Sequence, residues 1–170
     1  MNSSLLLKLA KPRTLLATVF VACLAIFGFA LYLQHAEVLE PCPMCILQRY
    51  AFAVIAIVAM IGAIQNPSTI GLRIYGGLVL IGALTGAGIA GRHSWLQRFP
   101  TPSYSCGADL EYLLDAFPLA KALPAIFAGT GECSKVQWRM LGLSIPEWAL
   151  VWFVIFAITA IVVILRTRRS

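Results

Sequence analysis

The sequence predicts an all-α membrane protein, a four-helix transmembrane bundle with a long outward-facing loop that carries short interfacial helices. Of its 170 residues, 60% are hydrophobic and only 12% are charged, about half the charged fraction of a soluble domain. Four runs with few charges are also long enough to cross a bilayer as helices. The net charge is +6, but the bases are not clustered with exposed aromatics, which argues against nucleic-acid binding.

Four transmembrane helices are predicted, at residues 14–33, 45–64, 74–91 and 148–165. The first run has 20 residues and would span roughly 30 Å as a helix, which is one hydrocarbon thickness. The apolar core of a signal peptide is shorter, about 7–15 residues, so we expect a retained helix. In the third run, Gly82 and Gly86 have the small-xxx-small spacing that lets two helices pack closely. The length of the chain fits a single membrane domain, residues 1–170.

The charges predict the orientation of the bundle. Four spans place both termini and the turn near Arg73 on one side, and that side carries seven bases and no acid. All seven acids lie on the other side, in the loops at residues 34–44 and 92–147. Bases in short flanks face the cytoplasm, so the two loops are expected in an oxidising compartment.

Parts of the second loop are amphipathic, which predicts short helices lying on the membrane surface. Two groups of apolar residues have helical spacing. The first is Leu110, Leu113, Leu114 and Phe117, and the second is Val136 and Met140, with Trp138 and Leu141 nearby.

Four of the five cysteines fall on the loop side, and an even number there predicts disulfides. Closeness in the sequence pairs Cys42 with Cys45 and leaves Cys106 to pair with Cys133. The Cys42–Cys45 loop is so short that closing it restricts little chain entropy. Redox cycling or metal binding therefore explains this pair better than stability does. The fifth, Cys23, lies midway along the first span and is expected to act as a small hydrophobic residue.

Two metal-linked alternatives are disfavoured. The four cysteines could supply four thiolates to zinc, but Cys106 and Cys133 are 27 positions apart and not a second close pair, and the compartment is oxidising. Covalent haem attachment needs a histidine directly after the second cysteine, where this chain has Ile46. We therefore expect no metal at this site.

The position of the Cys-x-x-Cys pair predicts its reactivity. If the second helix begins near Pro43, a residue suited to a first helical position, Cys42 lies at the cap and Cys45 in the first turn. Free amides and the helix dipole stabilise a thiolate there. Residues 42, 45 and 49 would share one face. An arginine such as Arg49 costs at least ~2.5–3.5 kcal/mol at the centre of a bilayer, so we expect it to act beside Cys45 and an oxygen of a lipid-soluble electron acceptor.

These features together resemble the bacterial disulfide bond formation protein B family (DsbB), over nearly the whole chain. The resemblance includes the Cys-x-x-Cys-x-x-x-Arg pattern, the second cysteine pair and the four spans. Further matching segments are Arg92-His93-Ser94-Trp95-Leu96-Gln97, Gly131-Glu132-Cys133 and Gln137-Trp138-Arg139-Met140-Leu141-Gly142-Leu143.

The resemblance implies a quinone-linked oxidase of the bacterial inner membrane, with cytoplasmic termini and periplasmic cysteines. A periplasmic thiol oxidase of the thioredoxin fold (DsbA-like) would attack Cys106, and the released Cys133 would exchange with Cys42. Cys45 would then face a membrane quinone, ubiquinone or alternatively menaquinone. Arg49 would assist that quinone, and His93 lies in a segment that the family associates with it.

Two other functions fit parts of the sequence. A four-helix membrane binding or scaffold protein would use the same cysteines as structural disulfides. The vitamin K epoxide reductase architecture also has four helices, but its membrane-proximal cysteine pair comes at the last span of the core. Here the pair follows the first span, which disfavours that assignment.

Overall fold

The computed structural model describes residues 11–39, 41–65, 67–99, 131–134 and 136–167. Its four long helices are α2 (Pro12–Ala36), α3 (Pro43–Gln65), α4 (Thr69–Arg98) and α8 (Ile145–Arg166). Each is long and apolar enough to cross a membrane, which confirms the predicted all-α, four-helix membrane fold. Between α4 and α8 the described residues form one helical turn, α7 (Gly131–Ser134), and two short strands, β1 (Arg139–Met140) and β2 (Leu143–Ser144).

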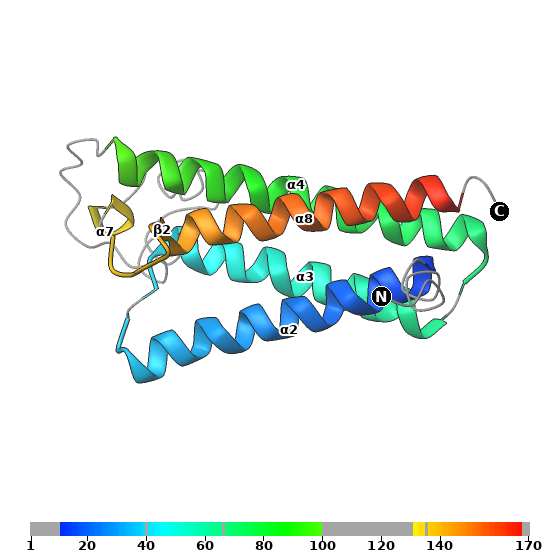
Figure 1. Cartoon of the computed structure of the whole chain (residues 1–170), viewed down its shortest axis with the longest axis horizontal. Coiled ribbons are helices and arrows are strands. Elements are labelled where there is room, and N and C mark those ends of the chain that lie inside the picture. The colour runs from blue at the N-terminus through cyan, green and yellow to red at the C-terminus, as the bar shows by residue number, and fades with distance from the viewer. Residues whose placement is uncertain (1–10, 40, 66, 100–130, 135, 168–170) are drawn as a thin grey trace, which may run out of the picture.

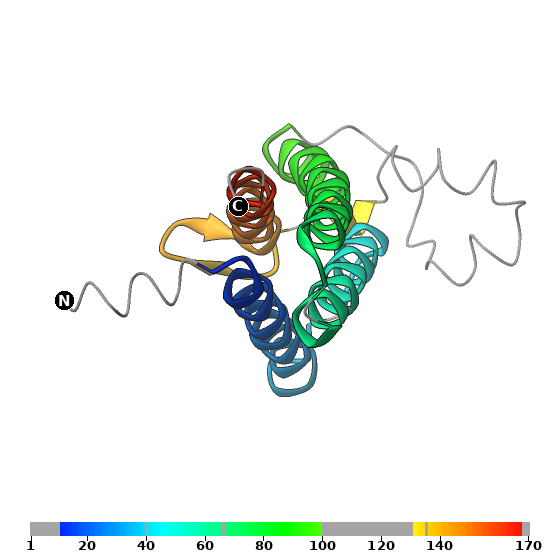
Figure 2. The same cartoon turned by 90° about the vertical axis from the view of Figure 1, so that its right-hand side faces the viewer.

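The helices run alternately up and down the bundle (Figure 1). The start of α2, the α3–α4 turn and the end of α8 lie at one end, and α7 and the strands lie at the other. Seen along the bundle, α3 lies between α2 and α4, and α8 packs mainly against α4 (Figure 2). Cys42 and Cys45 therefore lie at the same end of the bundle as Cys133.

Aromatic and small side chains fill the centre of the bundle. The rings of Phe52 and Phe153 stack with their centroids 4.1 Å apart. Cys23 is 1% exposed in the same apolar cluster, as expected of a small hydrophobic residue. Large apolar residues such as Val21 and Ile81 point outward and are well exposed, as a lipid-facing surface requires.

Gly86 permits the close contact between α4 and α8. A Cβ atom built at Gly86 would clash with the ring of Phe153, which lies in direct contact with the glycine backbone. Nothing lies within 4 Å of the corresponding position at Gly88. The contact at Gly86 agrees with a packing role for this glycine.

Gly86→Ala is expected to destabilise the bundle, because Phe153 is already held in a stack. Overpacking of this kind costs about 1–3 kcal/mol. Gly88→Ala, two residues away on the same helix, should be neutral or stabilising, since alanine is the better helix former. Thermal unfolding of both variants in detergent checks this, and equal unfolding temperatures would contradict it.

The helix that contains the third predicted span continues beyond residue 91 to Arg98, so His93 is helical. Hydropathy falls at the polar residues from Arg92 onward, but a helix can leave the bilayer without ending. The amphipathic segment Leu110–Phe117 lies outside the described residues.

The prediction of a short helix at residues 136–141 is wrong, because these residues are not helical. Strands β1 and β2 pair as an antiparallel hairpin, with Met140 opposite Leu143. Leu141 and Gly142 form its turn with positive φ values of 53° and 83°, as a two-residue hairpin turn requires. Trp148 of α8 donates its indole N–H to the Met140 carbonyl over 3.0 Å. The spacing of Val136 and Met140 fitted a helix, but the Leu-Gly turn decides the local structure.

Candidate redox site at the head of the bundle

The Cys-x-x-Cys pair lies at the start of α3, as predicted. Pro43 is the first residue of the helix, and the carbonyl of Cys42 accepts a hydrogen bond from the Ile46 amide over 3.1 Å. The Cys42 and Cys45 sulfurs are 3.3 Å apart, in contact but not bonded, since a disulfide measures about 2.05 Å. The two sulfurs are close enough to form a disulfide when an acceptor removes two electrons and two protons.

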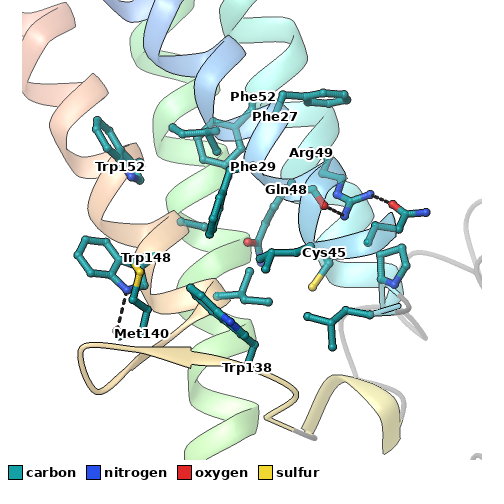
Figure 3. A pocket seen from close by; sticks show the side chains of 18 of the residues that line it. Phe27, Phe29, Cys45, Gln48, Arg49, Phe52, Trp138, Met140, Trp148 and Trp152 are labelled. Atoms are coloured by element: carbon teal, nitrogen blue, oxygen red, sulfur yellow. Dashed lines mark hydrogen bonds between the residues drawn. The ribbon is translucent and has the colours of Figure 1, made fainter. Parts of the chain in front are cut away.

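Cys45 faces a cavity of about 370 Å³, within the usual size range of small-molecule sites. Helices α2, α3 and α8 and the hairpin enclose it (Figure 3). Its walls are apolar and rich in aromatic rings: Phe27, Phe29, Phe52, Trp138, Trp148 and Trp152. Such walls suit a flat, lipid-soluble ring.

Arg49 lies on the wall of the same cavity, one turn of α3 after Cys45 (Figure 3). Its guanidinium donates to the side-chain oxygen of Gln34 over 2.6 Å and to the carbonyl of Ala30 over 3.2 Å. Both partners belong to α2, so these bonds hold a cation in place between two helices. The cavity thus presents one thiol and one fixed positive charge within apolar walls.

The other side of the pair faces His93 of α4. The Nε2 atom of His93 lies 3.6 Å from the Cys42 sulfur and 3.1 Å from the backbone oxygen of Cys133. The Nδ1 atom lies 3.1 Å from the side-chain nitrogen (Nε2) of Gln48. His93 and Cys133 are each 1% exposed, and Cys133 packs in one apolar cluster with Cys42, Met44 and Leu96. Residues from three segments of the chain thus meet at Cys42.

The donor atoms of Cys42, Cys45 and His93 lie within 4.8 Å of one another, a separation that a metal ion could bridge. The hydrogen bonds argue for a different use. A carbonyl oxygen only accepts, so Nε2 must carry a hydrogen to bond to Cys133. That nitrogen then has no lone pair to offer a metal, and the cluster is better suited to thiol chemistry.

The predicted site residues thus separate into two groups around the pair. Cys45 and Arg49 line the cavity, whereas Cys42, Cys133 and His93 lie together on the other side. His93, expected near a quinone, does not line the large cavity, but it lines a small neighbouring one of about 20 Å³ together with Cys42 and Cys45. Cys106 lies outside the described residues.

Sequence reasoning missed three residues of the site. Gln34 holds Arg49, Gln48 contacts His93, and Trp138 lines the cavity. Gln48 left a usable signal, because a polar side chain inside a membrane span needs a partner. Trp138 lies in a segment that resembles the family, but its place in the cavity wall depends on the hairpin.

Comparison with known proteins points to one family. The family model described as disulfide bond formation protein DsbB matches residues 12–163. A disulfide bond formation protein B from Aromatoleum aromaticum is 50% identical over 156 residues, which cover 92% of this chain and 94% of the relative. Another, from Polaromonas sp. strain JS666, is 47% identical over 162 residues, 95% of each chain.

Proposed function

Because this chain belongs to the disulfide bond formation protein DsbB family, a family of membrane disulfide oxidoreductases, we propose that its electron acceptor is a quinone. In this proposal it reoxidises a periplasmic DsbA-like thiol oxidase and passes the electrons to ubiquinone, or to menaquinone instead, in the bacterial inner membrane. One observation carries the proposal. Cys42 lies against Cys133, while its neighbour Cys45 faces an apolar cavity that also holds Arg49.

The first stage is an exchange among thiols. A thiolate of the partner attacks Cys106 of the Cys106–Cys133 disulfide, and the electron pair leaves on Cys133. The Cys133 thiolate then attacks the Cys42 sulfur, so that the Cys42–Cys133 bond forms and the Cys42–Cys45 bond breaks. The burial of Cys133 in the same cluster as Cys42 supports this order, because the exchange becomes intramolecular.

The second stage takes place at the cavity. The broken pair leaves a thiolate on Cys45, beside the fixed guanidinium of Arg49. A further thiolate that attacks Cys133 would release Cys42, and the Cys42–Cys45 disulfide would then re-form. A bound quinone would supply the acceptor for the two electrons and two protons given up in that step. Aromatic walls such as those of Phe52 and Trp138 would hold its ring, and Arg49 would stabilise negative charge on its oxygen. In this proposal His93 assists quinone use indirectly, through the cysteine pair, since it lies outside the cavity.

The charges at the two ends support the proposed orientation. Arg13 and Arg73 lie at the end where α2 begins and α8 ends, and each donates to a backbone carbonyl there, of Ala63 and Thr167. At the opposite end, Arg98 pairs with Glu147 over 2.6 Å. Basic flanks of this kind favour the cytoplasm, which leaves the cysteines on the periplasmic side.

Quinone reduction by the purified protein tests the proposal. With a reduced DsbA-like protein as donor, the native chain should reduce ubiquinone, and Cys45→Ala should lower the rate on the order of 10³-fold or more, because no thiolate then faces the acceptor. Cys23→Ala is the matched control, since Cys23 is buried away from the site, and it should keep the native rate. Undiminished quinone reduction in Cys45→Ala would refute the proposal.

Thiol trapping separates this function from a scaffold with structural disulfides. Without quinone, a reduced partner should convert disulfides of the native chain into alkylatable thiols. A scaffold would keep all four outer cysteines oxidised under the same conditions.

A further inference from the structure

Gln48 is a buried polar residue whose position calls for an explanation. It lies in the membrane-spanning part of α3, is 3% exposed, and comes three residues after Cys45. A buried amide is costly in an apolar setting unless it is hydrogen-bonded. Its side-chain nitrogen is 3.1 Å from Nδ1 of His93, and Gln48 also forms part of the cavity wall (Figure 3). Gln48 therefore links the cavity to the histidine behind the cysteine pair.

The hydrogen bonds around His93 fix its protonation pattern. Its Nε2 is 3.1 Å from the carbonyl oxygen of Cys133, which can only accept, so Nε2 carries the hydrogen. In a neutral ring Nδ1 is then the acceptor. The nitrogen of Gln48 is the donor that this arrangement needs. The carbonyl of Cys133 at Nε2 and the side-chain amide of Gln48 at Nδ1 together favour this one tautomer.

The same bonds run in one direction toward the cavity. Gln48 donates to His93, whose Nε2–H also faces the Cys42 sulfur at 3.6 Å. The Cys42 thiol in turn donates to the Cys45 sulfur over 3.3 Å. His93 and the Cys42 thiol thus each stabilise negative charge on the sulfur that they face. With its hydrogen on Nε2, His93 is a hydrogen-bond donor to Cys42 and not a base that removes its proton.

We propose that Gln48 is a positioning residue that holds His93 as a donor between Cys133 and Cys42 and so accelerates exchange between these two cysteines. This rests on the proposed function. In the step concerned, a thiolate that attacks Cys133 of the Cys42–Cys133 disulfide forms a new S–S bond. The old bond breaks with its electron pair on Cys42. No net oxidation occurs and no proton is consumed. A thiolate that is stabilised as it leaves departs faster, and His93 provides that stabilisation.

Two isosteric variants test the proposal. Gln48→Leu removes the donor, so the ring is no longer held in one tautomer. Gln48→Glu keeps a hydrogen on Nε2. A buried glutamic acid either donates its hydrogen to Nδ1 or transfers the proton to the ring, and Nε2 carries a hydrogen in both cases. In quinone-free protein mixed with a reduced DsbA-like donor, acid-quenched alkylation gives the rate at which the Cys42–Cys133 disulfide breaks. Gln48→Leu should slow this exchange by about 10-fold, and Gln48→Glu should stay close to the native rate.

The tautomer of His93 provides a readout that a merely structural role would not change. The chain has two histidines, His35 and His93, so ¹⁵N-histidine spectra are simple, and His35→Gln assigns them. The native chain and Gln48→Glu should show a hydrogen on Nε2 of His93, and Gln48→Leu should show a mixture of tautomers.

Three outcomes would overturn the proposal: native exchange in Gln48→Leu, equal slowing in both variants, or a native ring without hydrogen on Nε2. Failure of the proposed function looks different. In that case the native chain would reduce no quinone, whereas the ring spectra and the exchange driven by the thiol donor would still be measurable. Quinone reduction by the native chain is therefore recorded alongside.

Discussion

Cys133→Ala is expected to abolish oxidation of the thiol partner, lowering the steady-state rate on the order of 10³-fold or more. Cys133 lies against Cys42 in one apolar cluster, and an alanine there cannot carry electrons from the loop to the Cys42–Cys45 pair. The measurement is the rate at which a reduced DsbA-like protein is oxidised by purified protein with excess ubiquinone. Cys23→Ala, the fifth cysteine, is the control and should keep its rate.

The same variant should retain the second stage of the reaction. After reduction with dithiothreitol and removal of the reductant, Cys133→Ala should still reduce one equivalent of ubiquinone, because Cys42, Cys45 and Arg49 remain in place. Loss of this stage as well would indicate a damaged fold and call for a thermal unfolding comparison. Undiminished partner oxidation would show that electrons reach Cys42 by another route.

The four transmembrane helices could be predicted from the sequence because hydropathy and helix signals are local. The four spans follow from apolar runs, and Pro43 marks the start of α3 as a residue without an N–H suited to the first turn. The hairpin escaped prediction because its Leu141-Gly142 turn lies within a segment that also fits helical spacing. There the backbone at the turn, with two positive φ values, outweighed the side-chain pattern.

The candidate site was predictable where it depends on spacing along one helix. Cys45 and Arg49 lie four residues apart in α3, and both line the cavity. The contacts of His93 were not predictable in the same way. They depend on how α4 packs against the start of α3 and on where the segment that contains Cys133 lies. The partners of His93, Gln48 and Cys133, lie 45 and 40 positions away in the chain, and no local pattern encodes that meeting.

Arg49→Met is expected to impair quinone reduction far more than thiol exchange. Methionine keeps much of the length and the apolar stem, but it removes the charge beside Cys45 and the bonds to Gln34 and Ala30. Loss of a preorganised donor that faces developing negative charge on oxygen slows catalysis on the order of 10²–10³-fold. We expect a fall of this order in ubiquinone reduction, measured over a range of quinone concentrations so that weaker binding and slower turnover are separated.

Arg73→Met is the matched control for this prediction. Arg73 also spans two helices, donating to the carbonyl of Thr167 over 2.8 Å, but it lies at the opposite end of the bundle. Both variants lose an arginine that ties two helices together, so both report the structural cost of that loss. Only Arg49→Met should slow quinone reduction, and the quinone-free exchange between partner and cysteine pair should persist in both. If Arg49→Met slowed both stages equally, the guanidinium would be a tether between α2 and α3 and not a group that acts on the electron acceptor.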